Sequence, residues 1–70
     1  MTKITLDEIN IGDEILLEKG NYAGLYLVVL KKENKPNRQV YITVGQRNNK
    51  NFMKCLGDYR NIVISEIRRA

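Results

Sequence analysis

Six consecutive apolar residues, LYLVVL from Leu25 to Leu30, constrain the fold of this chain more than any other feature. Such a run suits a strand that is buried on both faces or strongly curved, as in a small barrel. A buried helix would also be apolar throughout. The β-branched pair Val28 and Val29, the short length and the glycine just before the run favour a strand instead. We therefore expect residues 25–30 to form a central strand.

Four other segments have the alternation or the short length typical of strands, and turn residues separate them. They are residues 14–19, 39–44, 52–56 and 62–67. The residues that we expect to face a shared core are Ile15, Leu17, Val29, Val40, Ile42 and Ile64. Two polar segments, KKENKPN at 31–37 and GQRNNKN at 45–51, are predicted to be hairpin turns, and residues 57–60 a tight turn.

Short segments flank these strands at both ends of the chain. Thr5 and Glu8 match a capping box, so residues 6–10 are expected to form one helical turn. The apolar residues available there to plug one end of the core are Ile4, Leu6, Ile9 and Ile11. Asp13 is expected to order its turn by accepting backbone hydrogen bonds, and residues 68–70 are expected to form a frayed tail.

A chain of 70 residues forms one domain, spanning residues 1–70, which is too small for two full sheets or a deep pocket. Five evenly spaced strands then predict an all-β fold. The most economical form is a small five-stranded antiparallel barrel with a short helical turn near the N-terminus, because closure protects most strand edges.

Glycine and apolar residues recur at defined spacings within residues 12–29. These positions are Gly12-Asp13, Ile15, Leu17, Gly20, Tyr22, Gly24 and Val29. The pattern resembles the KOW motif of SH3-like barrels in ribosomal proteins and transcription elongation factors. The family usually has another glycine three residues after Gly24, where this chain has Leu27. The resemblance implies an SH3-like barrel; many such barrels bind proteins, and some bind RNA or DNA.

Composition argues against catalysis and metal binding. The chain has no histidine, the commonest general base, and one cysteine, Cys55, so neither a disulfide framework nor a Cys/His zinc site is expected. The acidic residues match no calcium loop. We therefore expect no enzymatic activity, no cofactor and no small-molecule substrate. Cys55 is expected to be a core or half-buried residue, and a single thiol suits the reducing cytoplasm. No segment approaches the roughly 18–20 apolar residues that span a membrane.

Charge is distributed unevenly along the chain, whose formal net charge is +4. Residues 1–20 carry two basic and five acidic side chains, whereas residues 21–70 carry ten basic and three acidic ones. This balance suggests a polyanionic partner on one face, and the alternative is that the net charge only keeps a small protein soluble. The basic residues that we expect to contact phosphates are Lys31, Lys32, Lys35, Arg38, Arg47, Lys50, Lys54 and Arg60. The aromatic residues considered for base stacking are Tyr22, Tyr41 and Tyr59; Tyr26 and Phe52 are expected to pack in the core.

Two functional hypotheses follow from the sequence. The first is a module that binds nucleic acid weakly and with little sequence preference, mainly through phosphate contacts. The alternative is a protein-interaction module, an adaptor or inhibitor that docks an acidic protein surface. The composition, rich in Lys, Asn and Ile, fits an AT-rich genome and so a phage or mobile-element origin, where such modules often bind host machinery.

Overall fold

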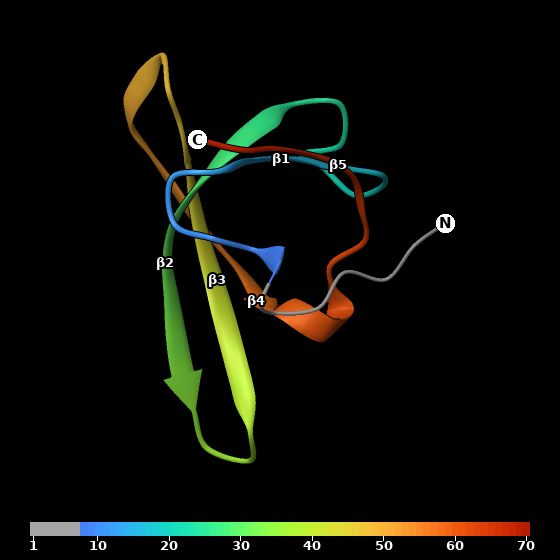
Figure 1. Cartoon of the computed structure of the whole chain (residues 1–70), viewed down its shortest axis with the longest axis vertical. Coiled ribbons are helices and arrows are strands. Elements are labelled where there is room, and N and C mark those ends of the chain that lie inside the picture. The colour runs from blue at the N-terminus through green and yellow to red at the C-terminus, as the bar shows by residue number, and fades with distance from the viewer. Residues whose placement is uncertain (1–7) are drawn as a thin grey trace.

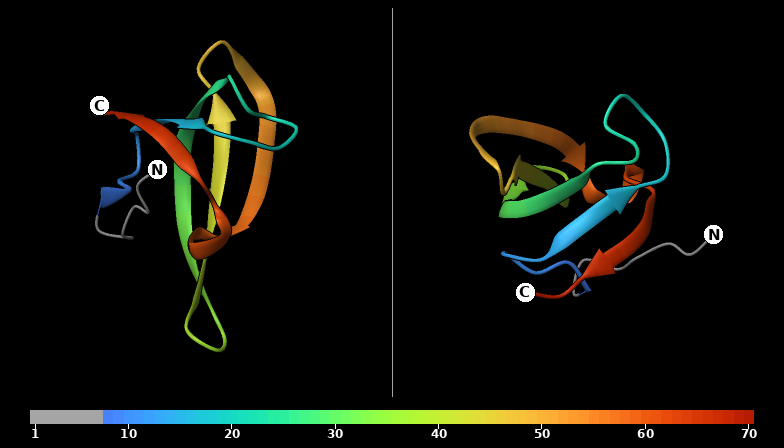
Figure 2. Two further views of the ribbon diagram at one scale, coloured as in Figure 1. Left: turned by 90° about the vertical axis from the view of Figure 1, so that its right-hand side faces the viewer. Right: turned by 90° about the horizontal axis from the view of Figure 1, so that it is seen from above.

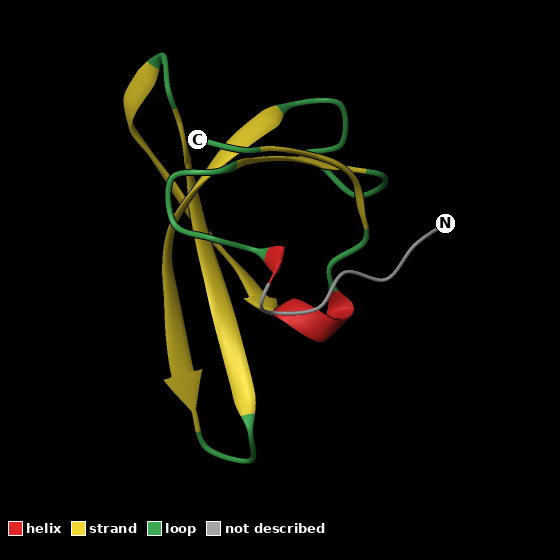
Figure 3. Cartoon of the chain, in the orientation of Figure 1, coloured by secondary structure: helices red, strands yellow, loops and turns green. Residues whose placement is uncertain are grey.

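The computed structural model describes residues 8–70, which form an all-β fold with five antiparallel strands in one sheet (Figure 1). The strands are β1 (Glu14–Leu17), β2 (Tyr26–Lys35), β3 (Gln39–Gln46), β4 (Asn49–Asp58) and β5 (Ile64–Arg68). A 3₁₀ helix, η2 (Tyr59–Asn61), connects β4 to β5 (Figure 3). The predicted all-β class and the number of strands are therefore confirmed. Within residues 8–70, no helix has the length and apolar character needed to cross a membrane.

The strand order is β4-β3-β2-β1-β5, so the first four strands follow one another and β5 returns to pair with β1. The sheet is strongly curled, and β1 and β5 lie across one face of β2 and β3 (Figure 2). Bulges contribute to this curl, because an unpaired extra residue bends a strand and increases its twist. The register of neighbouring strands skips Leu30 in β2, Leu56 in β4 and Ser65 in β5.

The bulge at Leu30 divides β2 into two parts with different partners. Residues 26–28 pair with β1, and Val29 exchanges backbone hydrogen bonds with Gly12 and Asp13. Beyond Leu30, β2 continues to Lys35 with β3 alone beside it. The expected end of this strand at Leu30 is therefore wrong, because pairing with β3 keeps the polar segment extended.

The two hairpin turns are shorter than predicted. The first hairpin turns over residues 36–38 and the second over residues 47–48, whereas the sequence predicted turns at 31–37 and 45–51. Both predictions relied on polar composition. Exposed hairpin strands are polar on their solvent faces, so composition alone places these turns too wide. The last strand begins at Ile64 instead of residue 62.

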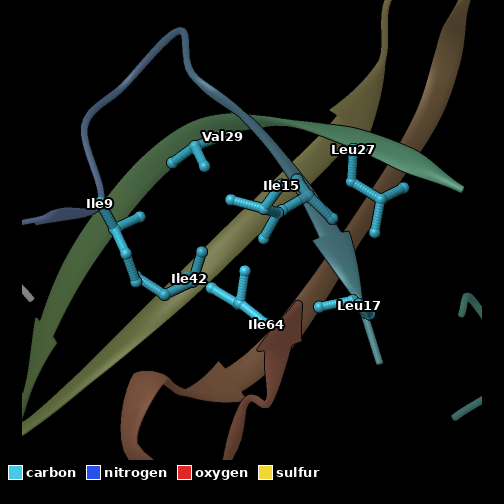
Figure 4. Packing of buried hydrophobic residues seen from close by; sticks show 8 residues of the cluster. Ile9, Ile15, Leu17, Leu27, Val29, Ile42 and Ile64 are labelled. Atoms are coloured by element: carbon cyan, nitrogen blue, oxygen red, sulfur yellow. The ribbon is translucent and has the colours of Figure 1, made fainter. Parts of the chain in front are cut away.

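The core lies between the two halves of the curled sheet (Figure 4). Five of the six predicted core residues are buried, namely Ile15, Leu17, Val29, Ile42 and Ile64. The sixth, Val40, is only partly buried. Ile9, Leu27 and Val44 complete the buried cluster. Leu27 pairs with Ile15 and is fully buried, so the larger residue at this motif position fills the core.

Hydrogen bonds attach residues 9–13 and the C-terminal residues to the sheet. The Lys32 ammonium group donates a 2.8 Å hydrogen bond to the carbonyl of Ile9, whose side chain is almost completely buried. Asp13 accepts hydrogen bonds from the Ala70 N–H and the Arg69 guanidinium, at 2.9 and 3.0 Å. The expected frayed tail over residues 68–70 is therefore wrong, since Arg68 belongs to β5 and Asp13 holds Arg69 and Ala70.

The N-terminal expectations are only partly covered by the described residues. Of the helical turn predicted over residues 6–10, residues 6 and 7 lie outside them, Glu8 lies in a 3₁₀ turn, and residues 9–10 are not helical. Ile4 and Leu6 also lie outside the described residues. Ile9 plugs the core as expected, whereas Ile11 is 61% exposed.

Candidate functional site

The eight predicted phosphate-binding residues do not form one continuous patch. The turns of the β2–β3 and β3–β4 hairpins lie at opposite ends of the molecule, which is 34 Å long (Figure 1). Arg38 belongs to the first turn and Arg47 to the second. Lys31, Lys32 and Lys35 lie within β2, and Lys50 and Lys54 within edge strand β4.

Two arginines at the β3–β4 end, Arg47 and Arg68, have acidic partners. Arg47 lies 3.7 Å from a carboxylate oxygen of Glu14. Arg68 lies 3.5 Å from Glu66 and stacks 3.8 Å from the ring centroid of Tyr26. Glu14, Arg47, Tyr26 and Arg68 line a hollow of about 350 Å³ beside the β3–β4 turn, and Glu66 pairs with Arg68 from outside its lining. Because carboxylates balance both guanidinium groups, this hollow has little net positive charge to attract an anion.

Arg60 supports the fold locally. Its guanidinium donates two hydrogen bonds to one oxygen of Asp58, at 3.0 and 2.7 Å, and its backbone N–H donates to the other oxygen at 3.3 Å. Asp58 thereby caps η2. The hydrogen bonds from the Arg60 side chain hold the pKa of Asp58 below its usual value, and Asp58 in turn raises the pKa of Arg60.

The three candidate stacking residues are all half-buried. Tyr22 meets Phe52 edge-to-face, with ring centroids 5.6 Å apart, and both side chains pack against the core. Tyr59 also packs against the core. The Lys35 ammonium group lies over the ring of Tyr41, 5.5 Å from the ring centroid. Each ring thus already has a protein neighbour on part of its surface.

Tyr26 differs from the core position expected for it. Its hydroxyl donates a 2.7 Å hydrogen bond to Glu66, and this bond raises the pKa of Tyr26. It pairs with Leu16 on the face of the sheet that points away from the core, since its neighbour Leu27 points inward. The apolar run predicted a strand but gave no signal for this surface role.

The β2–β3 hairpin carries the densest group of basic residues, with four cations and one acid, Glu33, in residues 31–38. Lys35 pairs with Glu33 at 3.2 Å, in an exposed contact of the kind that contributes little energy. No ion pair involves the exposed Lys31 or Arg38 among residues 8–70. Lys32 points to the core side, where it binds the Ile9 carbonyl.

The far part of this hairpin, residues 34–40, is a two-stranded ribbon that we name the arm. Asn34 pairs with Val40 and Lys35 with Gln39, and β4 reaches only as far as Tyr41, which pairs with Asp58. Apart from Val40, which packs against the core, the arm therefore extends beyond the rest of the sheet, as two perpendicular views show (Figure 1 and Figure 2). It carries two basic and no acidic side chains.

An exposed apolar area lies on the outer face of the sheet, near its centre. Val28 and Met53 both pair with Gly45, and a Cβ atom at Gly45 would lie 2.9 Å from Leu30. These three side chains, Val28, Leu30 and Met53, form what we call the outer patch. Met53 is 66% and Leu30 42% exposed. The sequence signal for it was the excess of apolar residues in LYLVVL over what one buried face needs.

The remaining features offer little for catalysis. Cys55 is exposed, so its expected burial is wrong; it lies on an edge strand, where no neighbour covers its outer side. No group of three or more acidic, cysteine or histidine side chains suited to a metal ion occurs within residues 8–70. A groove of about 180 Å³ beside Tyr22 and Ile62 is smaller than typical small-molecule pockets, which begin at about 300 Å³.

Comparisons with protein-family models, curated proteins and solved structures gave no match.

Proposed function

We propose that this chain is a small non-enzymatic binding module that holds nucleic acid weakly and with little sequence preference, through the β2–β3 hairpin. The single observation that carries the proposal is the position of the hairpin's basic residues. Residues 31–38 have a net charge of +3, and their far part extends beyond the rest of the molecule. Phosphates can therefore approach it from several sides, and phosphate contacts supply most of the affinity in non-specific binding.

We further propose that the fold is an SH3-like barrel. Supporting this, the sheet curls around one core, β5 returns to β1, and β4 and β5 remain as its two edges. Gly12, Gly20 and Gly24 of the KOW-like pattern all have positive φ angles, a conformation that other residues rarely adopt. We place the protein in the cytoplasm, because its single exposed thiol suits a reducing compartment.

A titration of labelled single- and double-stranded oligonucleotides at several salt concentrations tests the nucleic-acid proposal. The logarithm of the affinity should fall linearly with log[salt], with a slope of about −0.9 per phosphate contact on duplex DNA and about −0.7 on single strands. The double variant Lys31→Glu/Arg38→Glu should bind more weakly. The magnitude of its salt slope should fall by the amount expected for about two phosphate contacts. Lys32 is left unchanged because it supports the fold.

The matched control is Lys19→Glu, a reversal in the loop between β1 and β2, away from the arm. It should weaken binding far less than Lys31→Glu or Arg38→Glu does alone. Absence of binding to every oligonucleotide at low salt would overturn the proposal, because a functional basic hairpin attracts polyanions non-specifically under those conditions.

A second candidate function, docking to an acidic protein, is favoured by the outer patch. Leu30 and Met53 are exposed, and Leu30 directly precedes Lys31 in β2, so an acidic partner could combine apolar and ionic contacts there. In a nuclease-treated pull-down, this function predicts that one specific protein is retained by the wild type and lost by Met53→Ser. A captured protein that Met53→Ser retains equally well would argue against docking at this patch.

A further inference from the structure

The turn at the end of the arm has an unusual combination of residue and backbone conformation. Asn37 and Arg38 have φ angles of +64° and +62°, and they are the non-glycine residues with positive φ within residues 8–70. The Gln39 N–H points to the Pro36 carbonyl at 3.5 Å, so these two residues occupy the centre of a four-residue turn. Two left-handed residues at the centre define a type I′ turn.

Arginine is a poor choice for the second central position of such a turn. Asparagine is common at the first, and glycine is strongly preferred at the second because it has no Cβ to clash. Arg38 thus holds a strained conformation that a glycine would relieve. It also lacks an ion-pair partner among the described residues. Strain retained at an exposed position is a sign that the side chain itself is needed.

The arm has the dimensions of a groove-binding element. It consists of two strands, which lie about 4.8 Å apart. The major groove of B-form DNA is about 12 Å wide and admits a two-stranded β-ribbon. From the row of Asn34 and Val40 onward, no third strand widens the ribbon. The nearest acid on β2, Glu33, lies behind the arm and is paired with Lys35.

The side chains at the end of the arm suit base edges as well as phosphates. Arg38 offers a planar group of donors that matches the acceptors of guanine in the major groove, and Asn37 carries both a donor and an acceptor. Both side chains are exposed.

We propose that the arm enters the major groove of B-form duplex DNA with Arg38 foremost. This inference rests on the proposed nucleic-acid function and narrows it to one kind of duplex and one contact.

A comparison of duplex DNA with duplex RNA of the same sequence tests groove entry. The major groove of A-form RNA is deep and narrow, so the ribbon cannot enter it, whereas the phosphate charge is similar. We expect binding to duplex DNA to be at least about tenfold tighter than binding to duplex RNA. A tenfold difference corresponds to about 1.4 kcal/mol of binding free energy. Equal affinity for both duplexes would overturn groove entry and leave the proposed function standing. No binding to either would overturn both.

The variant Arg38→Gly distinguishes the contribution of Arg38 to DNA binding from its contribution to stability. Glycine should relieve the strained turn and raise the melting temperature by a few degrees, while affinity for duplex DNA falls about tenfold. Lys19→Gly, the control, removes the same charge elsewhere and should reduce affinity less than threefold. Arg38→Lys keeps the charge but loses the planar donors, so it should fall between wild type and Arg38→Gly.

Two outcomes of the binding measurements on these variants would overturn the proposed contact. If Arg38→Gly is more stable and still binds duplex DNA as tightly as the wild type, Arg38 makes no groove contact. If Arg38→Lys binds as well as the wild type, the contact is ionic only and the base-edge role is overturned. In either case the salt titration of the wild type still decides the broader function.

Discussion

A single carboxylate, that of Asp13, joins the beginning and the end of the described chain. It is almost fully buried and accepts hydrogen bonds from the backbone of Ala70 and the side chain of Arg69. The bond from the Ala70 N–H is the main reason that its pKa lies below the ordinary value of 3.8. The sequence suggested that Asp13 binds backbone N–H groups, but only the fold shows that one of them lies 57 residues away.

Asp13 should make stability depend on acid pH. Because folding lowers its pKa, its charged form stabilises the native state above about pH 3.8, and this contribution is lost as the pH falls through the folded-state pKa. Thermal unfolding followed by circular dichroism from pH 2 to 7 should show Asp13→Asn with a lower melting temperature at pH 7 and a weaker decline in acid. Asp58 shifts in the same direction, so Asp58→Asn should remove a separate part of that decline. An acid decline in Asp13→Asn as steep as in the wild type would contradict this account.

Two neighbouring lysines of β2 have different roles because the bulge at Leu30 resets the alternation of the strand. Lys31 pairs with Thr43 on the outer face, whereas Lys32 pairs with Ile42 on the core side and binds the Ile9 carbonyl. The sequence placed both lysines in a polar turn. A bulge leaves almost no signal in composition, so this difference could not be read from KKENKPN.

We predict that Lys32→Ala destabilises the fold and Lys31→Ala does not. Lys32→Ala removes a partly buried hydrogen bond from a charged donor, at a cost on the order of 1–3 kcal/mol, and loosens the Ile9 plug. Lys31→Ala should stay within about 0.5 kcal/mol of the wild type. Urea denaturation of both variants gives the two values. Equal stability of the variants would mean that the Lys32 contact contributes nothing.

Strand existence and the inward face were largely predictable, whereas strand ends and surface roles were not. Alternation identified Ile15, Leu17 and Ile42, because one buried face dictates their spacing. The length of β2 and β3 depends on their pairing with each other, which is a property of two distant segments. The internal partners of Arg47 and Arg60 likewise depend on which acid the fold brings near.

For the whole molecule, stability depends on one small core. A domain of this size has a free energy of unfolding of about 4–10 kcal/mol. Ile42→Ala should cost about 2–5 kcal/mol, because Ile42 is fully buried. Val40→Ala, on the same strand but only partly buried, should cost less than half as much. Thermal denaturation of the pair measures the difference, and an unchanged melting temperature for Ile42→Ala would contradict the inward assignment.

The bulges also determine what the two edges of the sheet offer to other chains. On β4, the longest stretch of pairing without a register shift is residues 53–55, and on β5 it is residues 66–68. Fibrils grow when a strand of about six or seven residues stacks on an identical one in an unbroken ladder. Neither edge presents a regular run of that length. We therefore expect the native protein to seed amyloid poorly, and we expect fibrils to form only after the sheet opens.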